Sequence, residues 1–404
     1  MPLSTPHIVV DTQTMLAERL SGIGHYGLGI AQAMDRLAAG GLFSYSLIAP
    51  RKLYGRVPAL PLRACRDAVP VGRLAEKLTH QILKRRLGLS IDWLLPEGAY
   101  YFPAFKVLPM KARPTSVVIH DLAHLDVPEC VEAGNVAFLD YALPRSVAQA
   151  RSLIAVSEFT RQRIVHHFQV DPARIHVAPP AVDRRVYRPV DPVQARATRE
   201  RYGVDCEAYF LSVATLEPRK NLLNLIDAFA ALPPAERRHY ALVLIGAKGW
   251  DNGATQARIE QARKAGARIV QPSGFVADED MAAFYTGAQA LAFVPLYEGF
   301  GMPPLEAYAC GTPVLASRVA SVPEAAGEPA RYVDDPRDVA AIRDGLLALA
   351  ALGQAGRQSL QPAMQRHLER FDWMHSGAAT VSAITGIPAS ALLGSVDYPP
   401  PAAA

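Results

Sequence analysis

The sequence predicts an α/β protein of two doubly wound halves, each a parallel β-sheet with helices on its faces. Short apolar, β-rich runs alternate with helical patterns, which is typical of such sheets. The 404 residues exceed what one hydrophobic core usually supports. A Pro- and Arg-rich connection at residues 187–205, without a predicted strand, splits the alternation into two series. Because ligands bind such sheets at the carboxyl ends of the strands, we expect a cleft between the halves.

The predicted strands justify this division. The first series is HIVVD, FSYSLIAP, TSVVIHD, SLIAVS and RIHVAPPAV, and the second is YFLSVAT, YALVLIG, RIVQPSG, ALAFVPL, PVLAS and ARYVDD. The predicted N-terminal domain covers residues 1–190 and the C-terminal domain covers residues 191–375. A helix at 376–392 is expected to cross back to the N-terminal domain. The tail 393–404 has too few core-forming residues to order itself.

Composition excludes several classes of protein. Lys plus Arg exceeds Asp plus Glu by only 4, which disfavours a nucleic-acid binder. The chain shows neither a leader-like N-terminus nor eighteen uninterrupted apolar residues, so we expect a cytoplasmic protein, peripheral at most on a membrane. The four cysteines stand far apart without a CxxC pair, which favours reduced thiols over a disulfide frame or a zinc knot.

The stretch PLYEGFGMPPLEAYACGTPVLAS, residues 295–317, predicts an anion site. Its glycines suit a tight turn, and Pro303 with Pro304 suits the first turn of a helix that runs through Ala309. A glycine-rich turn before a helix leaves free amide donors and a partial positive charge. Carboxylates repel phosphate but accept hydrogen bonds from sugar hydroxyls. We therefore expect Glu306 to bind ribose and Glu298 to bind a transferred sugar; alternatively, both simply favour the helix dipole.

The spacing of the two glutamates in EGFGMPPLE resembles the signature of the retaining glycosyltransferases of family four, which share the two-domain GT-B fold. Other segments agree in order along nearly the whole chain: SGIGHYG, HDLAHLDVPE, LIAVSEFTRQRI, VATLEPRKNLLNLIDAF, SGFVADEDM and FDWMHSGAAT. Within this family, TLEPRKN resembles bacterial mannosyltransferases of O-antigen and exopolysaccharide synthesis. The resemblance implies a metal-independent hexosyltransferase that uses a nucleotide diphosphate sugar.

The resemblance also implies that positively charged side chains bind and neutralise the diphosphate. Lys220 falls on the family's lysine position, but Thr215 occupies the position of the family's arginine. Arg219 is the expected replacement, because a planar guanidinium can bind phosphate with two hydrogen bonds. The mechanism that the resemblance implies has the departing diphosphate itself help to deprotonate the acceptor hydroxyl. Its growing charge is then expected to be stabilised by Lys220, Arg219 and the amides of Gly299, Phe300, Gly301 and Met302.

Three further regions carry expected roles by resemblance. Gly22, Ile23 and Gly24 are expected to form a glycine loop whose backbone binds the donor. The formal GxGxxG pattern there is weak evidence for an NAD site, because ten residues separate it from the preceding strand. His120, at the end of a strand, is expected beside the transferred sugar. Without the resemblance, a histidine at a strand end is more often a polar residue with its hydrogen bonds satisfied than a catalytic residue. Phe275 and Val276 are expected to hold the nucleobase, or else merely to end a strand.

The expected donor is GDP-mannose, with UDP-sugars and dTDP-rhamnose as alternatives, and the expected acceptor is a saccharide or a lipid-linked saccharide. No DxD pair is suitably placed, so we expect no divalent metal and no other cofactor. Residues 72–90 predict a basic amphipathic helix that suits an anionic membrane surface, although the same pattern is slightly more typical of an ordinary core-packed helix. Competing interpretations are a sugar-nucleotide epimerase, a phosphorylase, an NAD-dependent oxidoreductase and a non-catalytic sugar-nucleotide-binding protein.

Overall fold

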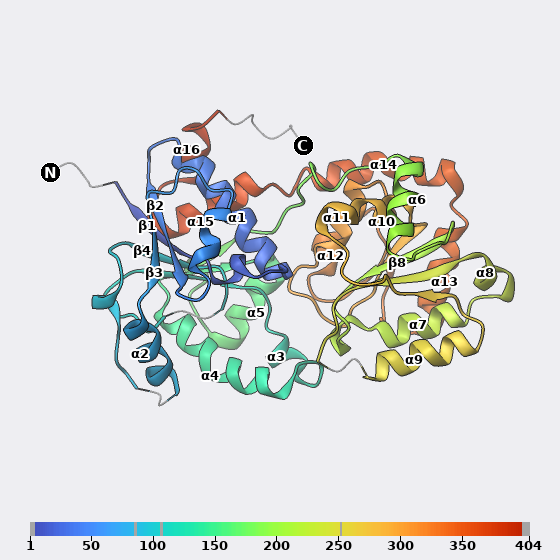
Figure 1. Cartoon of the computed structure of the whole chain (residues 1–404), viewed down its shortest axis with the longest axis horizontal. Coiled ribbons are helices and arrows are strands. Elements are labelled where there is room, and N and C mark those ends of the chain that lie inside the picture. The colour runs from blue at the N-terminus through green and yellow to red at the C-terminus, as the bar shows by residue number, and fades with distance from the viewer. Residues whose placement is uncertain (1–4, 85–86, 106–107, 251–252, 398–404) are drawn as a thin grey trace. The chain divides into compact units, whose positions relative to one another are not determined.

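The computed structural model describes residues 5–84, 87–105, 108–250 and 253–397, and it contains the two parallel sheets that the sequence predicts (Figure 1). The first sheet has the strand order β3-β2-β1-β4-β5-β6-β7. Its strands are β1 His7–Asp11, β2 Ser44–Pro50, β3 Ala68–Val71, β4 Ala99–Phe102, β5 Thr115–Ile119, β6 Ser152–Ala155 and β7 Ile175–Val177. The sequence pattern missed β3 and β4. β3 is an edge strand that contains Pro70, and both strands span only four residues.

The second sheet has the order β10-β9-β8-β11-β12-β13, and all six strands were predicted. They are β8 Tyr209–Val213, β9 Ala241–Ile245, β10 Ile269–Val270, β11 Ala290–Phe293, β12 Val314–Ser317 and β13 Arg331–Val333. Apolar side chains of α7 (Leu222–Ala230), α9 (Gly253–Lys264) and α13 (Val339–Ala350) share one buried core with these strands. Figure 1 shows α7 and α9 on one side of β8 and α10 (Met281–Gly287) and α11 (Pro303–Ala309) on the other. The strands are thus covered on both faces, as a parallel sheet requires.

The chain divides by its contacts into two units, each of which contains one sheet. The first comprises residues 5–122, 137–180 and 371–397, and the second comprises residues 123–136 and 181–370. The predicted divisions follow residues 190 and 375, whereas the observed ones follow Pro180 and Arg370. The pattern also gave no sign that residues 123–136 pack with the second unit, because they continue directly from β5 of the first sheet.

The remaining helices connect the strands. In the first unit they are α1 Gly22–Ala38, α2 Arg73–Lys84, α5 Glu158–Phe168, α15 Trp373–Thr385 and α16 Ala389–Gly394, and α4 Ala133–Gln149 begins in the second unit. In the second unit they are α3 Ala123–Asp126, α6 Pro192–Arg201, α8 Pro234–His239, α12 Val322–Ala326 and α14 Gly353–Leu368. Short 3-10 helices occupy Gln13–Leu16, Tyr54–Ala59, Asp92–Leu94, Pro128–Cys130, Pro172–Arg174, Pro218–Lys220 and Asp278–Asp280.

The C-terminal helix differs from its prediction. Instead of one helix at 376–392, α15 ends at Thr385, where Gly386 adopts a left-handed φ of +81°, and α16 begins after Pro388. α15 packs against α1 within the first unit. In the predicted disordered tail, Gly394 still belongs to α16, and residues 398–404 lie outside the described residues. None of the single helices within the described ranges is long and apolar enough to cross a membrane.

The packing of α1 on α15 requires glycine at position 29. A Cβ atom built on Gly29 would lie 2.6 Å from the Trp373 ring, closer than van der Waals contact permits. We predict that Gly29→Ala lowers the free energy of unfolding by about 1–3 kcal/mol, measured by urea denaturation. Gly22→Ala, in the same helix but with nothing within 4 Å of the added carbon, serves as the matched control and should cost nothing. Equal stabilities of the two variants would contradict this packing.

Candidate functional site

Two loops at the carboxyl ends of the neighbouring strands β8 and β11 build the candidate site. The β8 loop ends in the 3-10 turn Pro218–Lys220, and the β11 loop carries Glu298. The backbone N–H of Leu296 donates to the carbonyl of Arg219 at 2.9 Å. Asn221, in a left-handed conformation with φ +60°, donates its side-chain amide to the carbonyl of Val294 at 2.8 Å. One backbone bond and one side-chain bond to the backbone thus hold the two loops together.

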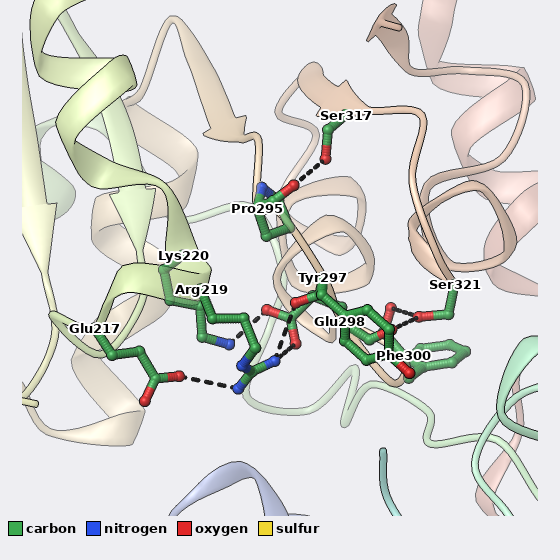
Figure 2. A network of polar contacts seen from close by, with 9 residues as sticks. All are labelled: Glu217, Arg219, Lys220, Pro295, Tyr297, Glu298, Phe300, Ser317 and Ser321. Atoms are coloured by element: carbon green, nitrogen blue, oxygen red, sulfur yellow. Dashed lines mark hydrogen bonds and ion pairs between the residues drawn. The ribbon is translucent and has the colours of Figure 1, made fainter. Parts of the chain in front are cut away.

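A charged cluster, consisting of Glu217, Arg219, Lys220 and Glu298, joins the same loops through side chains (Figure 2). Lys220 Nζ lies 2.5 Å from Glu298 Oε1, and Arg219 Nη1 lies 2.8 Å from Glu298 Oε2. Arg219 also donates Nη2 to Glu217 Oε1 at 2.9 Å and Nη1 to the carbonyl of Tyr297 at 3.1 Å. The structure therefore brings together Lys220, Arg219 and Glu298, all three of which the sequence singled out.

The cluster is largely removed from water. Only 8% of the Glu298 side chain, 15% of Lys220 and 16% of Arg219 is exposed. Burial alone would raise the pKa of Glu298, but the charges and hydrogen bonds of Lys220 and Arg219 outweigh it and hold this pKa below its ordinary value. Glu298 is therefore ionised, and the two cations with the two carboxylates give the cluster a net charge of zero.

The turn between Glu298 and α11 is fixed by its glycine and by Ser321. Gly301 has φ +93°, and a Cβ there would lie 2.9 Å from the Phe293 ring. Ser321 Oγ lies 2.8 Å from the carbonyl oxygen of Glu298 and 3.1 Å from that of Phe300 (Figure 2). The predicted helix from Pro303 to Ala309 is confirmed as α11. The amides from Gly299 to Met302 remain predicted phosphate donors.

Glu306 lies in the first turn of α11, as predicted, but in a different environment from Glu298. Its carboxylate accepts hydrogen bonds from the hydroxyl groups of Tyr285, at 2.5 Å, and Tyr187. Burial, together with the nearby charge of Asp278, raises the pKa of Glu306 to about 7, although both tyrosine hydrogen bonds oppose the shift. The carboxyl group is thus held by two phenols, whereas the predicted ribose contact is untested.

The raised pKa of Glu306 predicts a pH dependence. In the unfolded chain the group titrates near 4.5, so the folded chain binds a proton more tightly between pH 4.5 and about 7. The stability that this carboxyl contributes is therefore present at acid pH and is lost as the pH rises through 7, at up to about 1.4 kcal/mol per pH unit. Glu306→Gln cannot titrate, so its stability relative to wild type should increase from pH 5 to pH 8 in urea denaturation. A constant difference would contradict the shift.

The structure corrects the expected glycine loop. Gly22, Ile23 and Gly24 form the first turn of α1 rather than a loop, and Ser21 caps this helix by accepting from the Gly24 N–H at 3.4 Å. A Cβ on Gly24 would lie 2.8 Å from the carbonyl oxygen of Thr14, so close backbone approach accounts for this glycine. The three residues present amides at a helix start, and their contact with a donor is untested.

His120 directly follows β5, as the strand pattern predicted. Its Nε2 donates to the carbonyl of Pro103 at 2.7 Å, which leaves Nδ1 as the acceptor, and its ring meets Tyr26 edge-on at 5.1 Å. Burial lowers the pKa of His120 more than the Pro103 bond and the charge of Asp121 raise it, so the imidazole is neutral near pH 7. A neutral, oriented imidazole suits hydrogen bonding to a sugar.

The remaining predicted residues lie in loops of the second unit. Thr215 contributes its carbonyl to the turn, accepting from the Glu217 N–H at 2.9 Å. Phe275 is 50% exposed, whereas Val276 is 5% exposed and belongs to the core. Of the two residues, only Phe275 exposes a large part of its side chain, and the predicted contact of both with a nucleobase is untested.

Sequence reasoning missed four residues that organise the site: Glu217, Tyr285, Ser321 and Asp126. Glu217 lies inside the EPRKN segment and could have been found there as a carboxylate beside a predicted phosphate-binding arginine. Asp126 accepts a hydrogen bond from the hydroxyl of Tyr297 at 2.8 Å. Tyr285 and Ser321 carry no local signal, because only tertiary packing places them beside Glu306 and the β11 loop. No group of three His, Cys, Asp or Glu suited to a metal occurs within the described ranges.

Comparison with known proteins defines the class. The family model "Glycosyl transferases group 1" matches residues 196–360, and "Glycosyltransferase Family 4" matches residues 40–186. The chain therefore belongs to the glycosyltransferases that these two models describe, which confirms the resemblance to family four. It is 29% identical over 384 residues to the O-antigen chain mannosyltransferase B of Escherichia coli, and the match covers 90% of this chain and 96% of that protein.

Solved structures confirm the GT-B fold. WaaG, a glycosyltransferase involved in lipopolysaccharide biosynthesis, has a TM-score of 0.65 at 17% identity, covering 94% of this chain and 100% of that chain. Anabaena HepE in complex with UDP-glucose has a TM-score of 0.63 at 16% identity, covering 93% of this chain and 99% of that chain.

Proposed function

We propose that this glycosyltransferase is a retaining, metal-independent mannosyltransferase that transfers mannose from GDP-mannose to a saccharide or lipid-linked saccharide in bacterial surface polysaccharide synthesis. The observation that carries the chemistry is the contact of Arg219 and Lys220 with Glu298 at the carboxyl ends of β8 and β11. Two cations suit a diphosphate leaving group, and a carboxylate suits sugar hydroxyls. The likeness to an O-antigen mannosyltransferase over 90% of this chain supports the choice of mannose.

In the proposed reaction the acceptor oxygen bonds to the anomeric carbon on the face from which the diphosphate departs. The anomeric carbon–phosphate oxygen bond breaks, and the acceptor's proton passes to the departing nucleoside diphosphate. Lys220, Arg219 and the amides from Gly299 to Met302 stabilise the charge that grows on this leaving group. Such preorganised donors act strongly because the site is mostly buried. Glu298 orients the transferred sugar, and His120 is a further proposed sugar contact.

Lys220→Met tests the proposed leaving-group stabilisation. Losing this cation should lower kcat/KM for GDP-mannose by at least about 100-fold, measured by release of GDP in the presence of acceptor. Lys264→Met, at the exposed end of α9, removes the same charge away from the site and should retain full activity. A Lys220→Met enzyme that is folded and as active as the control would refute the role of Lys220.

The donor is tested by ligand-induced changes in thermal stability. Among GDP, UDP, dTDP and ADP, GDP should raise the Tm most, because a ligand stabilises the state that it binds. A larger shift with UDP would instead favour a UDP-sugar.

Proton NMR of the product formed from GDP-mannose should show an α-linked mannose, the configuration of the donor. An inverted product would contradict the retaining mechanism.

We also propose that the surface around α2 binds anionic membranes. Ala75, Thr79 and Ile82 form the buried face of α2, while Arg73 and Lys77 are exposed. Large apolar side chains nearby in sequence are also exposed: Leu74 53%, Leu87 44%, Leu89 60% and Trp93 70%. Exposed leucines and a tryptophan beside basic residues suit the boundary between lipid headgroups and acyl chains. The side chains of residues 83–86, part of the predicted basic helix, lie outside the described residues.

Sedimentation with vesicles tests this membrane proposal. Vesicles rich in phosphatidylglycerol should bind the protein at low salt and release it at high salt, and Leu89→Ser with Trp93→Ser should weaken binding about tenfold or more. Leu223→Ser, an exposed leucine of the second unit, is the control. Equal binding of the double variant and wild type would contradict a role for this surface.

A further inference from the structure

The diphosphate site proposed above is already filled by the protein's own carboxylates. Both Glu298 oxygens are used, one by Lys220 and the other by Arg219, and a second carboxylate, Glu217, binds the other terminal nitrogen of Arg219. Figure 2 shows Glu217 and Glu298 approaching the arginine from different loops. The cations are therefore charge-compensated before a ligand arrives.

A diphosphate cannot simply be added to this arrangement. Its negative charges would meet the ionised Glu298 in a site where water screens little, because the side chains are only 8–16% exposed. The repulsion is removed when the carboxylate leaves Lys220 and Arg219 and the phosphate oxygens take its place. Both cations then exchange one anionic partner for another, so neither cation is left unpaired, while the displaced carboxylate requires hydrogen bonds from sugar hydroxyls in place of its ion pairs.

We propose that Glu298 is an internal anion that occupies the diphosphate site and is displaced by the donor, and that Glu217 is a positioning residue that holds Arg219 during the exchange. This inference rests on the proposed function. The displaced Glu298 carboxylate becomes available to accept hydrogen bonds from the transferred sugar. Binding of the diphosphate therefore frees the same Glu298 side chain that orients the sugar, and this links the two events.

Glu217 is suited to its role by its position in the chain. It lies two residues before Arg219 in the same turn, and its backbone N–H is bonded to the carbonyl of Thr215. Its contact with Arg219 therefore does not depend on the β11 loop that carries Glu298. When Glu298 is displaced, Glu217 still fixes one edge of the guanidinium.

Calorimetric titration with inorganic pyrophosphate tests the inference. Pyrophosphate carries neither nucleobase nor sugar, so its affinity reports on the diphosphate site alone. Glu298→Gln removes the competing anion and should bind pyrophosphate at least about tenfold more tightly than wild type. Glu217→Ala also removes a negative charge, and a purely electrostatic effect would make pyrophosphate bind more tightly. Because the variant also loses the contact that positions Arg219, we expect pyrophosphate to bind about tenfold more weakly than to wild type. Glu260→Gln breaks an exposed pair with Arg263, 2.7 Å apart, and should leave binding unchanged.

The outcomes separate the inference from the proposed function. Unchanged or weaker pyrophosphate binding by a folded Glu298→Gln variant overturns the displacement of Glu298. Tighter or unchanged binding by Glu217→Ala overturns the positioning role, whether or not Glu298→Gln folds. If Glu298→Gln does not fold, Glu298→Ala, which also removes the competing anion, is titrated in its place. Tighter pyrophosphate binding by Glu298→Gln without transfer of any sugar by the wild type supports the inference while contradicting the proposed mannosyltransferase.

Discussion

The ion pairs that Arg219 and Lys220 make with Glu298 are the constraint on which the candidate site depends. They connect the loops of β8 and β11, strands that are adjacent in the sheet but distant in sequence. An ionised carboxylate with 8% exposure persists only because these cations compensate its desolvation. The same contacts place the two cations together, and their proximity gives the site its affinity for a diphosphate in the proposed function.

The backbone around this cluster is fixed by several residues, so the proposed displacement of Glu298 is a movement of its side chain. Asn221 and Gly301 hold left-handed conformations, and Ser321 binds the β11 loop through two carbonyls. Glu306 is fixed separately by Tyr285. The two glutamates that look equivalent in sequence therefore have opposite electrostatic environments: cations lower the pKa of Glu298, whereas burial raises that of Glu306. Such divergence suits distinct roles for the two carboxyl groups.

Much of this arrangement could be predicted from sequence, because it follows from local patterns. The strands of the second sheet are short, mostly apolar runs, and Pro303 with Pro304 after a glycine-rich turn predicts the start of α11. The pairing of Lys220 with Glu298 was not predictable in detail, because it depends on β11 lying beside β8. The start of α1 was misjudged as a loop because its glycines obscured a helix that Ser21 caps. β3 was missed because Pro70 argues against a strand, whereas β4 was missed although its aromatic residues favour one.

The most direct test of the central claim is a crystal structure of the protein with bound GDP. The account predicts that diphosphate oxygens lie within hydrogen-bonding distance of Lys220 Nζ and the Arg219 guanidinium, and that the Glu298 carboxylate has moved away from Lys220. A structure in which the diphosphate binds elsewhere, while the Lys220–Glu298 contact of 2.5 Å persists, would contradict it.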